Sequence, residues 1–171
     1  MNGMTIEIRR VTPAEAQSYR TIRLEGLQRN PEAFASTFEF EDAQPDSWFA
    51  ERLATSEVLG AWHGADLVGV VGFRVQQGLK VAHKGVLWGM YVRPDFRKTG
   101  TAQRLIEALI SIASARVELV QLSVWQGNAA ARRLYASFGF VEYGEEIHAL
   151  KQNGVYYNEI LMARMVRGNS N

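Results

Sequence analysis

The chain of 171 residues contains no cysteine. A disulfide framework, a metal site built from thiolates and a cysteine acyl-enzyme intermediate are therefore excluded. Proline is scarce, with four residues, and the three histidines are dispersed without the spacing of metal ligands. We expect no bound metal.

Neither sign of charge is in excess, because 19 Lys and Arg residues are balanced by 18 Asp and Glu residues. The near-neutral chain creates no overall field for nucleic acid or for an anionic membrane, and we expect neither as a partner. Residues 1–10 lack the apolar core of a signal peptide, and no apolar run is long enough to span a bilayer. We therefore expect a cytoplasmic protein.

The composition that remains, 47% apolar and 22% charged, is typical of a globular protein with a sizeable core. We expect one domain over residues 1–171, with a frayed tail over residues 167–171. Charge is concentrated locally, since four basic residues and one acidic residue lie between Arg93 and Arg104. This segment suits a small polyanion.

The first half of the chain is predicted to begin with a strand over residues 5–11. Thr12 and Pro13 then provide the N-cap and the first-turn proline of a helix that continues to about Arg29. The later elements of this half are an aromatic and acidic loop over residues 33–42, a helix over about 46–54, and strands over 57–63, 67–77 and 80–93.

In the second half, apolar positions from Ala102 to Ala113 recur at helical spacing and predict a helix with one buried face. A strand over 117–125 precedes a helix over 129–138, for which Asn128 is placed as N-cap and Gly139 as the residue after the C-cap. Strands over 140–147 and 155–165 form a last hairpin. Composition and periodicity alone predict a mixed α/β domain with a meander of antiparallel strands.

One motif lies between a predicted strand and a predicted helix, in the loop of Arg97, Lys98, Thr99, Gly100, Thr101 and Ala102. Clustered backbone N–H groups, the positive end of a helix and fixed cations make such a loop suitable for a pyrophosphate. Gly100 would let the backbone approach the ligand. The string R-x-x-G-x-A is common by itself, and a helix start also explains it, but its position favours the anion site.

A second motif, N-x(2)-A-x(3)-Y-x(3)-G-F, occupies Asn128, Ala131, Tyr135, Gly139 and Phe140. Seven residues, or two helical turns, separate Asn128 from Tyr135, so both lie on one face of the helix and can reach one ligand. Asn128 could serve as an N-cap alone, and Tyr135 could be a core aromatic whose hydroxyl bonds to the backbone.

Both motifs resemble signatures of the GNAT N-acetyltransferase superfamily, and the order of predicted elements resembles that family over nearly the whole chain. The resemblance implies an α/β domain of the α+β type. In this fold a mixed, mostly antiparallel central sheet of about seven strands is flanked by about four helices. Its fourth and fifth strands splay apart and admit the pantetheine arm. Many members carry glycine where this chain has Lys98.

The resemblance further implies an acyltransferase that moves the acetyl group directly from acetyl-CoA, as co-substrate, to an amine of a small molecule or a peptide terminus. The cofactor-binding residues would be Met90, Tyr91 and Val92 on the fourth strand, the loop from Arg97 to Ala102, Asn128 and Tyr135. Tyr135 would be the general acid for the departing thiolate. A non-catalytic acyl-CoA-binding sensor on the same fold is the alternative, and a homodimer is left open.

The proton acceptor is predicted within the loop over residues 33–42. An amine with a pKa near ~10.4 must lose a proton before it attacks a thioester. We expect Glu39 to be the base and Phe34, Phe38 and Glu39 to bind the acceptor, because aromatic neighbours could desolvate the carboxyl. Alternation could equally place the rings in the core and the acids in water. The other candidates are Glu41, Asp42, Glu145, Glu146 and His148.

Overall fold

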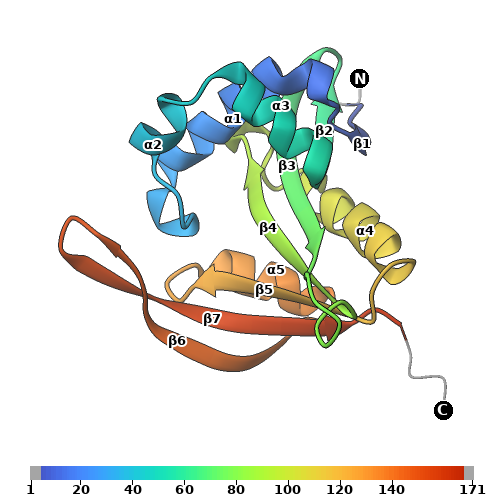
Figure 1. The fold of residues 1–171 in the computed structure, drawn as a ribbon, viewed down its shortest axis with the longest axis vertical. Helices are drawn as coiled ribbons and strands as arrows, with labels where there is room; N and C mark the ends of the chain where they lie inside the picture. Colours follow the sequence, from blue (N-terminus) through green and yellow to red (C-terminus); the bar gives the residue numbers. More distant parts are fainter. Residues whose placement is uncertain (1–4, 168–171) are drawn as a thin grey trace.

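The computed structural model describes residues 5–167, so residues 168–171 of the expected tail lie outside the described residues. One sheet of seven strands forms its centre, in the order β1-β2-β3-β4-β5-β7-β6 (Figure 1). Among the described strands only β4 and β5 pair in parallel, which confirms the mixed, mostly antiparallel sheet. The strands are β1 (Glu7–Arg10), β2 (Glu57–His63), β3 (Asp66–Val75), β4 (Lys84–Val92), β5 (Leu119–Trp125), β6 (Val141–Gln152) and β7 (Val155–Met165).

The α-helices within residues 5–167 are α1 (Ala16–Arg29), α2 (Phe38–Asp42), α3 (Asp46–Thr55), α4 (Thr101–Ser114) and α5 (Ala129–Ser137). Short 3₁₀ turns occur at Pro13–Glu15, Pro31–Ala33 and Pro94–Phe96. The predicted caps of α5 are confirmed: Asn128 Oδ1 accepts from Ala131 N at 3.0 Å, and Gly139 has a φ of +81°. No helix among the described residues is long and apolar enough to cross a membrane.

The prediction of a loop over residues 33–42 is wrong at its end, because residues 38–42 form α2. Thr37 Oγ1 accepts a hydrogen bond from Phe40 N at 3.3 Å and caps the helix, and Glu39 and Glu41 lie in its first turn. The helix changes which side chains point inward, because residues three and four apart now share a face. This change decides the position of the acidic residues.

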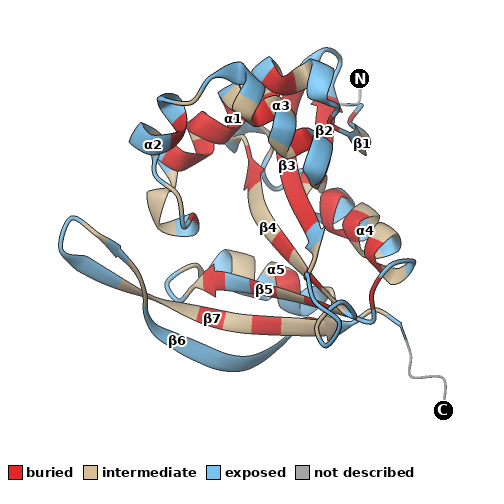
Figure 2. Ribbon diagram, viewed as in Figure 1, coloured by how far each residue is buried: buried red, intermediate tan, exposed pale blue. Residues whose placement is uncertain are grey.

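Two apolar cores lie on opposite faces of the sheet. On one face, α4 and α5 pack through residues such as Leu105, Leu109 and Tyr135. The other face is covered by α1 and α3, with Tyr19 and Phe49 fully buried. Figure 2 shows buried residues on α1, α3 and α4 and shows β6, which lies at the edge of the sheet, as exposed.

The sheet opens between β4 and β5, as the resemblance implied. Only three residue pairs join them, from Lys84 with Leu119 to Val86 with Gln121, and the strands then diverge (Figure 1). Beyond Val86, β4 carries one extra residue relative to β3, and Gly89 adopts a φ of +63° at this bulge. A bulge with glycine in the left-handed region bends a strand and increases its twist, which turns β4 away from β5.

Candidate active site

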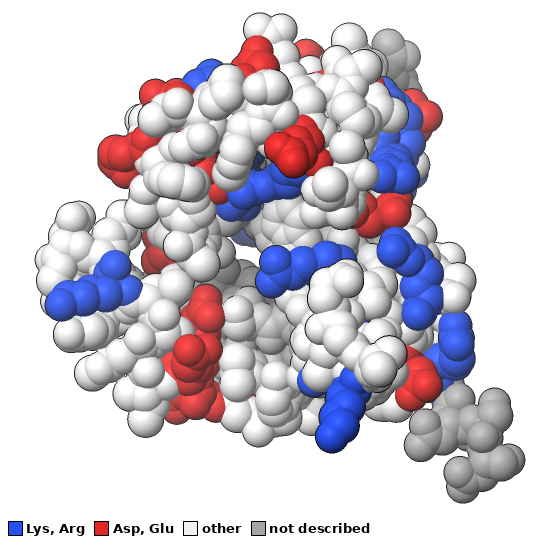
Figure 3. Space-filling model, in the orientation of Figure 1, with Lys and Arg blue, Asp and Glu red and all other residues white. Residues whose placement is uncertain are grey.

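A cavity of about 480 Å³ lies where β4 and β5 separate. Side chains from the end of β4, the start of α4 and the inner face of α5 form its walls, and Figure 3 shows the molecule hollowed between its two halves, with basic atoms at the rim. The predicted residues that line it are Phe34, Met90, Tyr91, Val92, Arg97, Lys98, Ala102, Asn128 and Tyr135. The structure thus brings together both motifs, which are about thirty residues apart in the chain.

The loop before α4 presents unpaired backbone donors. In the part of the chain that the structure describes, the N–H groups of residues 98–103 donate to no backbone or side-chain acceptor, and no side chain caps α4. Lys98 and Gly100 have φ values of +59° and +84°, a left-handed geometry that turns successive N–H groups toward one side. Lys98 therefore adopts a conformation that favours glycine. Such a cradle at a helix N-terminus fits a pyrophosphate.

The three residues between Lys98 and Ala102 do not line the cavity. Thr99 Oγ1 donates to Phe96 O at 2.6 Å and lies 2.9 Å from Thr101 Oγ1. These contacts occupy both hydroxyls in holding the loop. We infer that Thr99, Gly100 and Thr101 contribute through their backbone.

Arg97 ties the same loop to β4. Its Nε donates to Val92 O at 2.8 Å, its Nη2 to Asn30 Oδ1 at 3.3 Å, and its guanidinium carbon lies 5.6 Å from the centre of the Tyr91 ring. The Tyr91 hydroxyl donates to Glu25 at 2.9 Å. Burial and this contact raise the pKa of Tyr91 to about 12, so its hydroxyl stays neutral near pH 7. Tyr91 thus forms part of the wall.

Asn128 and Tyr135 lie one above the other on α5 and both line the cavity. Asn128 is an N-cap whose side chain also borders the cavity. Tyr135 is 5% exposed and packs edge-on against Phe140, and its hydroxyl has no hydrogen-bond partner among residues 5–167. Burial raises the pKa of this hydroxyl, which keeps it protonated at neutral pH. A protonated hydroxyl beside a cavity can donate a proton.

A second cavity, of about 650 Å³, adjoins the first. The two meet at the bulge of β4, because they share the lining residues Ala33, Phe34, Leu87, Trp88, Gly89 and Ser123. Two arginines, Arg23 and Arg74, and one carboxylate, Glu159, are the ionisable residues that line the second cavity. Within residues 5–167, no group of three or more His, Cys, Asp or Glu side chains is arranged to hold a metal ion.

The residues predicted for the acceptor are separated by the structure. Phe34 lines both cavities, whereas Phe38 and Glu39 line neither, and Glu39 is exposed on the outer side of α2. Glu41 is the acid that becomes fully buried. The expectation that Glu39 is desolvated between aromatic rings is therefore wrong, because helical spacing places Glu41 inward with Phe38.

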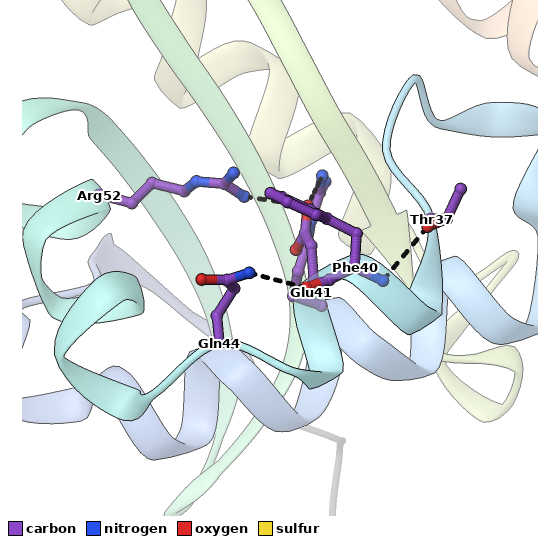
Figure 4. Close-up of polar contacts among 6 residues, drawn as sticks. Thr37, Phe40, Glu41, Gln44 and Arg52 are labelled. Atoms are coloured by element: carbon purple, nitrogen blue, oxygen red, sulfur yellow. Dashed lines mark hydrogen bonds and ion pairs between the residues drawn. The ribbon is translucent and has the colours of Figure 1, made fainter.

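Glu41 is held by two arginines. It accepts from Arg23 Nε and Nη2 at 2.9 and 2.8 Å, and Arg52 Nη1 approaches it at 3.4 Å from α3 (Figure 4). Burial by itself would raise the pKa of the Glu41 carboxyl, but the hydrogen bond and charge of Arg23, the charge of Arg52 and a hydrogen bond from Ser36 lower it overall. Glu41 is thus a paired anion and not a base.

Arg23 and Glu159 are not among the site residues predicted from the sequence. Both interrupt apolar patterns, Arg23 among Ile22, Leu24 and Leu27 of α1, and Glu159 before Ile160 in β7. A charged residue at an inward position, next to apolar residues that face the core, was the available signal. Of the other acids considered, Glu145 is exposed, accepts a hydrogen bond from Asn158 and lines neither cavity.

Comparison with known proteins gives a consistent result. Residues 23–140 match the acetyltransferase (GNAT) family. The L-amino acid N-acetyltransferase AaaT of Escherichia coli K12 is 27% identical over 157 residues, which cover 89% of this chain and 94% of that protein. A GNAT acetyltransferase from Streptococcus pneumoniae has the same fold, with a TM-score of 0.81, 21% identity and 94% and 99% of the two chains covered. The YncA protein of Salmonella typhimurium, solved with its cofactor acetyl-CoA, has a TM-score of 0.81 at 17% identity, with 98% and 97% of the two chains covered.

Proposed function

The chain belongs to the acetyltransferase (GNAT) family, and we propose that it transfers the acetyl group of acetyl-CoA to the amine of a small molecule or a peptide terminus. The observation that carries this proposal is the junction of the two cavities at Gly89 and Ser123. A donor that enters from the loop before α4 and an acceptor that enters beside α1 and α2 would meet there. The name of the E. coli relative supports an amino acid as the acceptor.

The residues of the first cavity fit the co-substrate. The unpaired N–H groups of residues 98–103 and the positive end of α4 would hold the pyrophosphate. Beyond Val86, the edge of β4 that faces β5 pairs with no strand within residues 5–167. The polar groups of Met90 to Val92 there would bind the pantetheine arm. Asn128 would contribute its amide from the opposite wall.

Acetyl-CoA supplies an activated acyl carbon. The amine nitrogen bonds to that carbon as the carbon–sulfur bond breaks, and Tyr135 donates a proton to the departing sulfur. The ammonium form of the acceptor loses two protons overall. A base takes one and passes it to solvent, and the other returns to Tyr135 to replace the proton given to the sulfur. We assign the role of base to Glu159, the carboxylate that lines the second cavity, where the acceptor would bind. The exposed Glu39 is not assigned this role.

Acetyl-CoA consumption measured against amino acids, polyamines, aminoglycosides and peptides tests the reaction. We expect turnover with at least one class of free amine. Binding of acetyl-CoA without turnover across the whole panel would favour the non-catalytic sensor. The homodimer stays a prediction, which light scattering after size-exclusion chromatography measures.

A further inference from the structure

Arg23 is buried, yet one edge of its guanidinium group is unused. Nε and Nη2 donate to Glu41, while Nη1 donates to no acceptor in residues 5–167. The residue is 7% exposed and lines the second cavity. Nη1 is not among the fully buried atoms of residues 5–167 that lack a hydrogen-bond partner, so it is open to the cavity. The free edge is therefore positioned for something that enters the cavity.

This free edge of the Arg23 guanidinium lies at the junction of the two cavities, where we propose that the acetyl group is transferred. Nη1 is 3.2 Å from the position that a Cβ on Gly89 would occupy, and Gly89 is the bulge residue that borders both cavities. The ring of Phe34 lies 4.8 Å from the guanidinium carbon and covers one of its faces. Glu41 fixes the group through two hydrogen bonds. The guanidinium is thus held in one orientation beside the place where the amine must react.

The local charge balance calls for an anion. Glu41 carries one negative charge, whereas Arg23 and Arg52 carry two positive charges around it. Arg52 is partly open to solvent, which balances its charge, whereas the unused edge of the buried Arg23 is stabilised by an anionic partner in the cavity. The fork of a guanidinium group matches a carboxylate, with charge-assisted hydrogen bonds that exceed neutral ones in strength.

We propose that Arg23 determines acceptor specificity by binding the α-carboxylate of a free amino acid. This assignment rests on the proposed N-acetyltransferase function. Because Arg23 lies at the bulge itself, the carboxylate must be close to the reacting nitrogen, as it is when both are bonded to one carbon. Phe34, Phe40 and Trp88 line the same cavity and would contact an apolar side chain. An amine without a carboxylate would leave Arg23 unpaired.

Three acceptors of matched shape test the assignment: L-leucine, L-leucinamide and 3-methylbutylamine. We expect wild-type protein to prefer leucine in kcat/KM by about 10- to 100-fold, the range expected for a hydrogen bond to a charged group. Arg23→Gln should remove that preference and leave the KM for acetyl-CoA unchanged. Arg52→Gln is the matched control. It removes one of the two positive charges that contact Glu41, but Arg52 does not line the second cavity. It should retain the preference.

Equal use of the three acceptors by wild-type protein would overturn the proposal, as would an Arg23→Gln variant that loses all three equally. If Arg23→Gln does not fold, the double variant Arg23→Gln with Glu41→Gln, which removes both buried charges, is used in its place.

Calorimetric titration with 4-methylpentanoate, which is leucine without its amine, in the presence of CoA gives a readout independent of turnover. If no amine is acetylated, the proposed function fails, and binding that requires Arg23 still supports the carboxylate site. Binding that is equal with and without Arg23 contradicts it.

Discussion

At the scale of single residues, the buried hydroxyl of Tyr135 can be separated from the ring that carries it. Tyr135→Phe keeps the packing against Phe140 and removes the proton donor. We expect kcat to fall about 10²-fold, the usual effect of losing a general acid, with acetyl-CoA affinity nearly unchanged. Steady-state kinetics and calorimetry measure the two quantities. Tyr143→Phe, on the exposed β6, is the control, and wild-type turnover in Tyr135→Phe would reduce Tyr135 to a wall residue.

Glu41 provides a prediction about pH. The pKa of its carboxyl in the folded state lies below 4.5, the value of an unperturbed glutamate. Its contribution to stability is therefore fully present above about pH 4.5 and is lost as the pH falls through the folded-state pKa. At pH 7, Glu41→Gln should lower the free energy of unfolding by on the order of 3 kcal/mol, because two arginines lose their anion. The difference from wild type should shrink as the pH falls below about 4.5.

Urea denaturation at a series of pH values measures this difference, and Glu39→Gln is the matched control on the same helix. Because Glu39 is exposed, its substitution should give no comparable change in stability at any pH. A constant gap between wild type and Glu41→Gln at all pH values would show that the charge of Glu41 does not act as described.

At the scale of elements, the loop before α4 depends on a left-handed backbone conformation at Gly100 that is unfavourable for valine. Gly100→Val places a β-branched residue at a φ of +84°, and the loop should leave that conformation to relieve a cost of about 1–2 kcal/mol. We expect acetyl-CoA binding to be lost in a calorimetric titration. Gly154→Val, at a φ of +80° in the β6–β7 turn, carries the same penalty far from the loop. Both glycines have open space around them, so unchanged affinity in Gly100→Val would contradict the anion-cradle assignment.

Most elements were predictable because each repeats a local pattern. The one-sided apolar spacing of α4 and the caps of α5 are fixed by residues close in sequence, and the structure confirms both. The segment over residues 37–42 was not predictable in the same way. Its alternating rings and acids fit an extended loop, but the Thr37 cap and the pairing of Glu41 with Arg23, 18 residues away, select a helix. Long-range pairing of this kind leaves no local periodicity in the sequence. For the same reason Arg23 was not predicted as a site residue.

At the scale of the whole molecule, the sheet is two parts joined by three residue pairs between β4 and β5. The first cavity has walls from both parts, with Met90 to Val92 on one side and Asn128 and Tyr135 on the other. A ligand that spans this cavity should therefore restrain both parts together. At 100 times its Kd, acetyl-CoA should raise the free energy of unfolding by about 2.7 kcal/mol. Amide hydrogen exchange should slow in residues 87–92 and in residues 128–135.

The nucleotide half of CoA, 3′-phosphoadenosine 5′-diphosphate, separates bridging from simple occupancy of the loop. It lacks the pantetheine arm, so its protection should be confined to the loop of residues 97–103 and the start of α4, where the unpaired N–H groups lie. Acetyl-CoA should add protection on both β4 and α5, because only the arm reaches between them. If acetyl-CoA and the nucleotide protect the same amides, the arm does not occupy the opening between β4 and β5. The junction at Gly89 and Ser123 would then not be the place where the acetyl group is transferred.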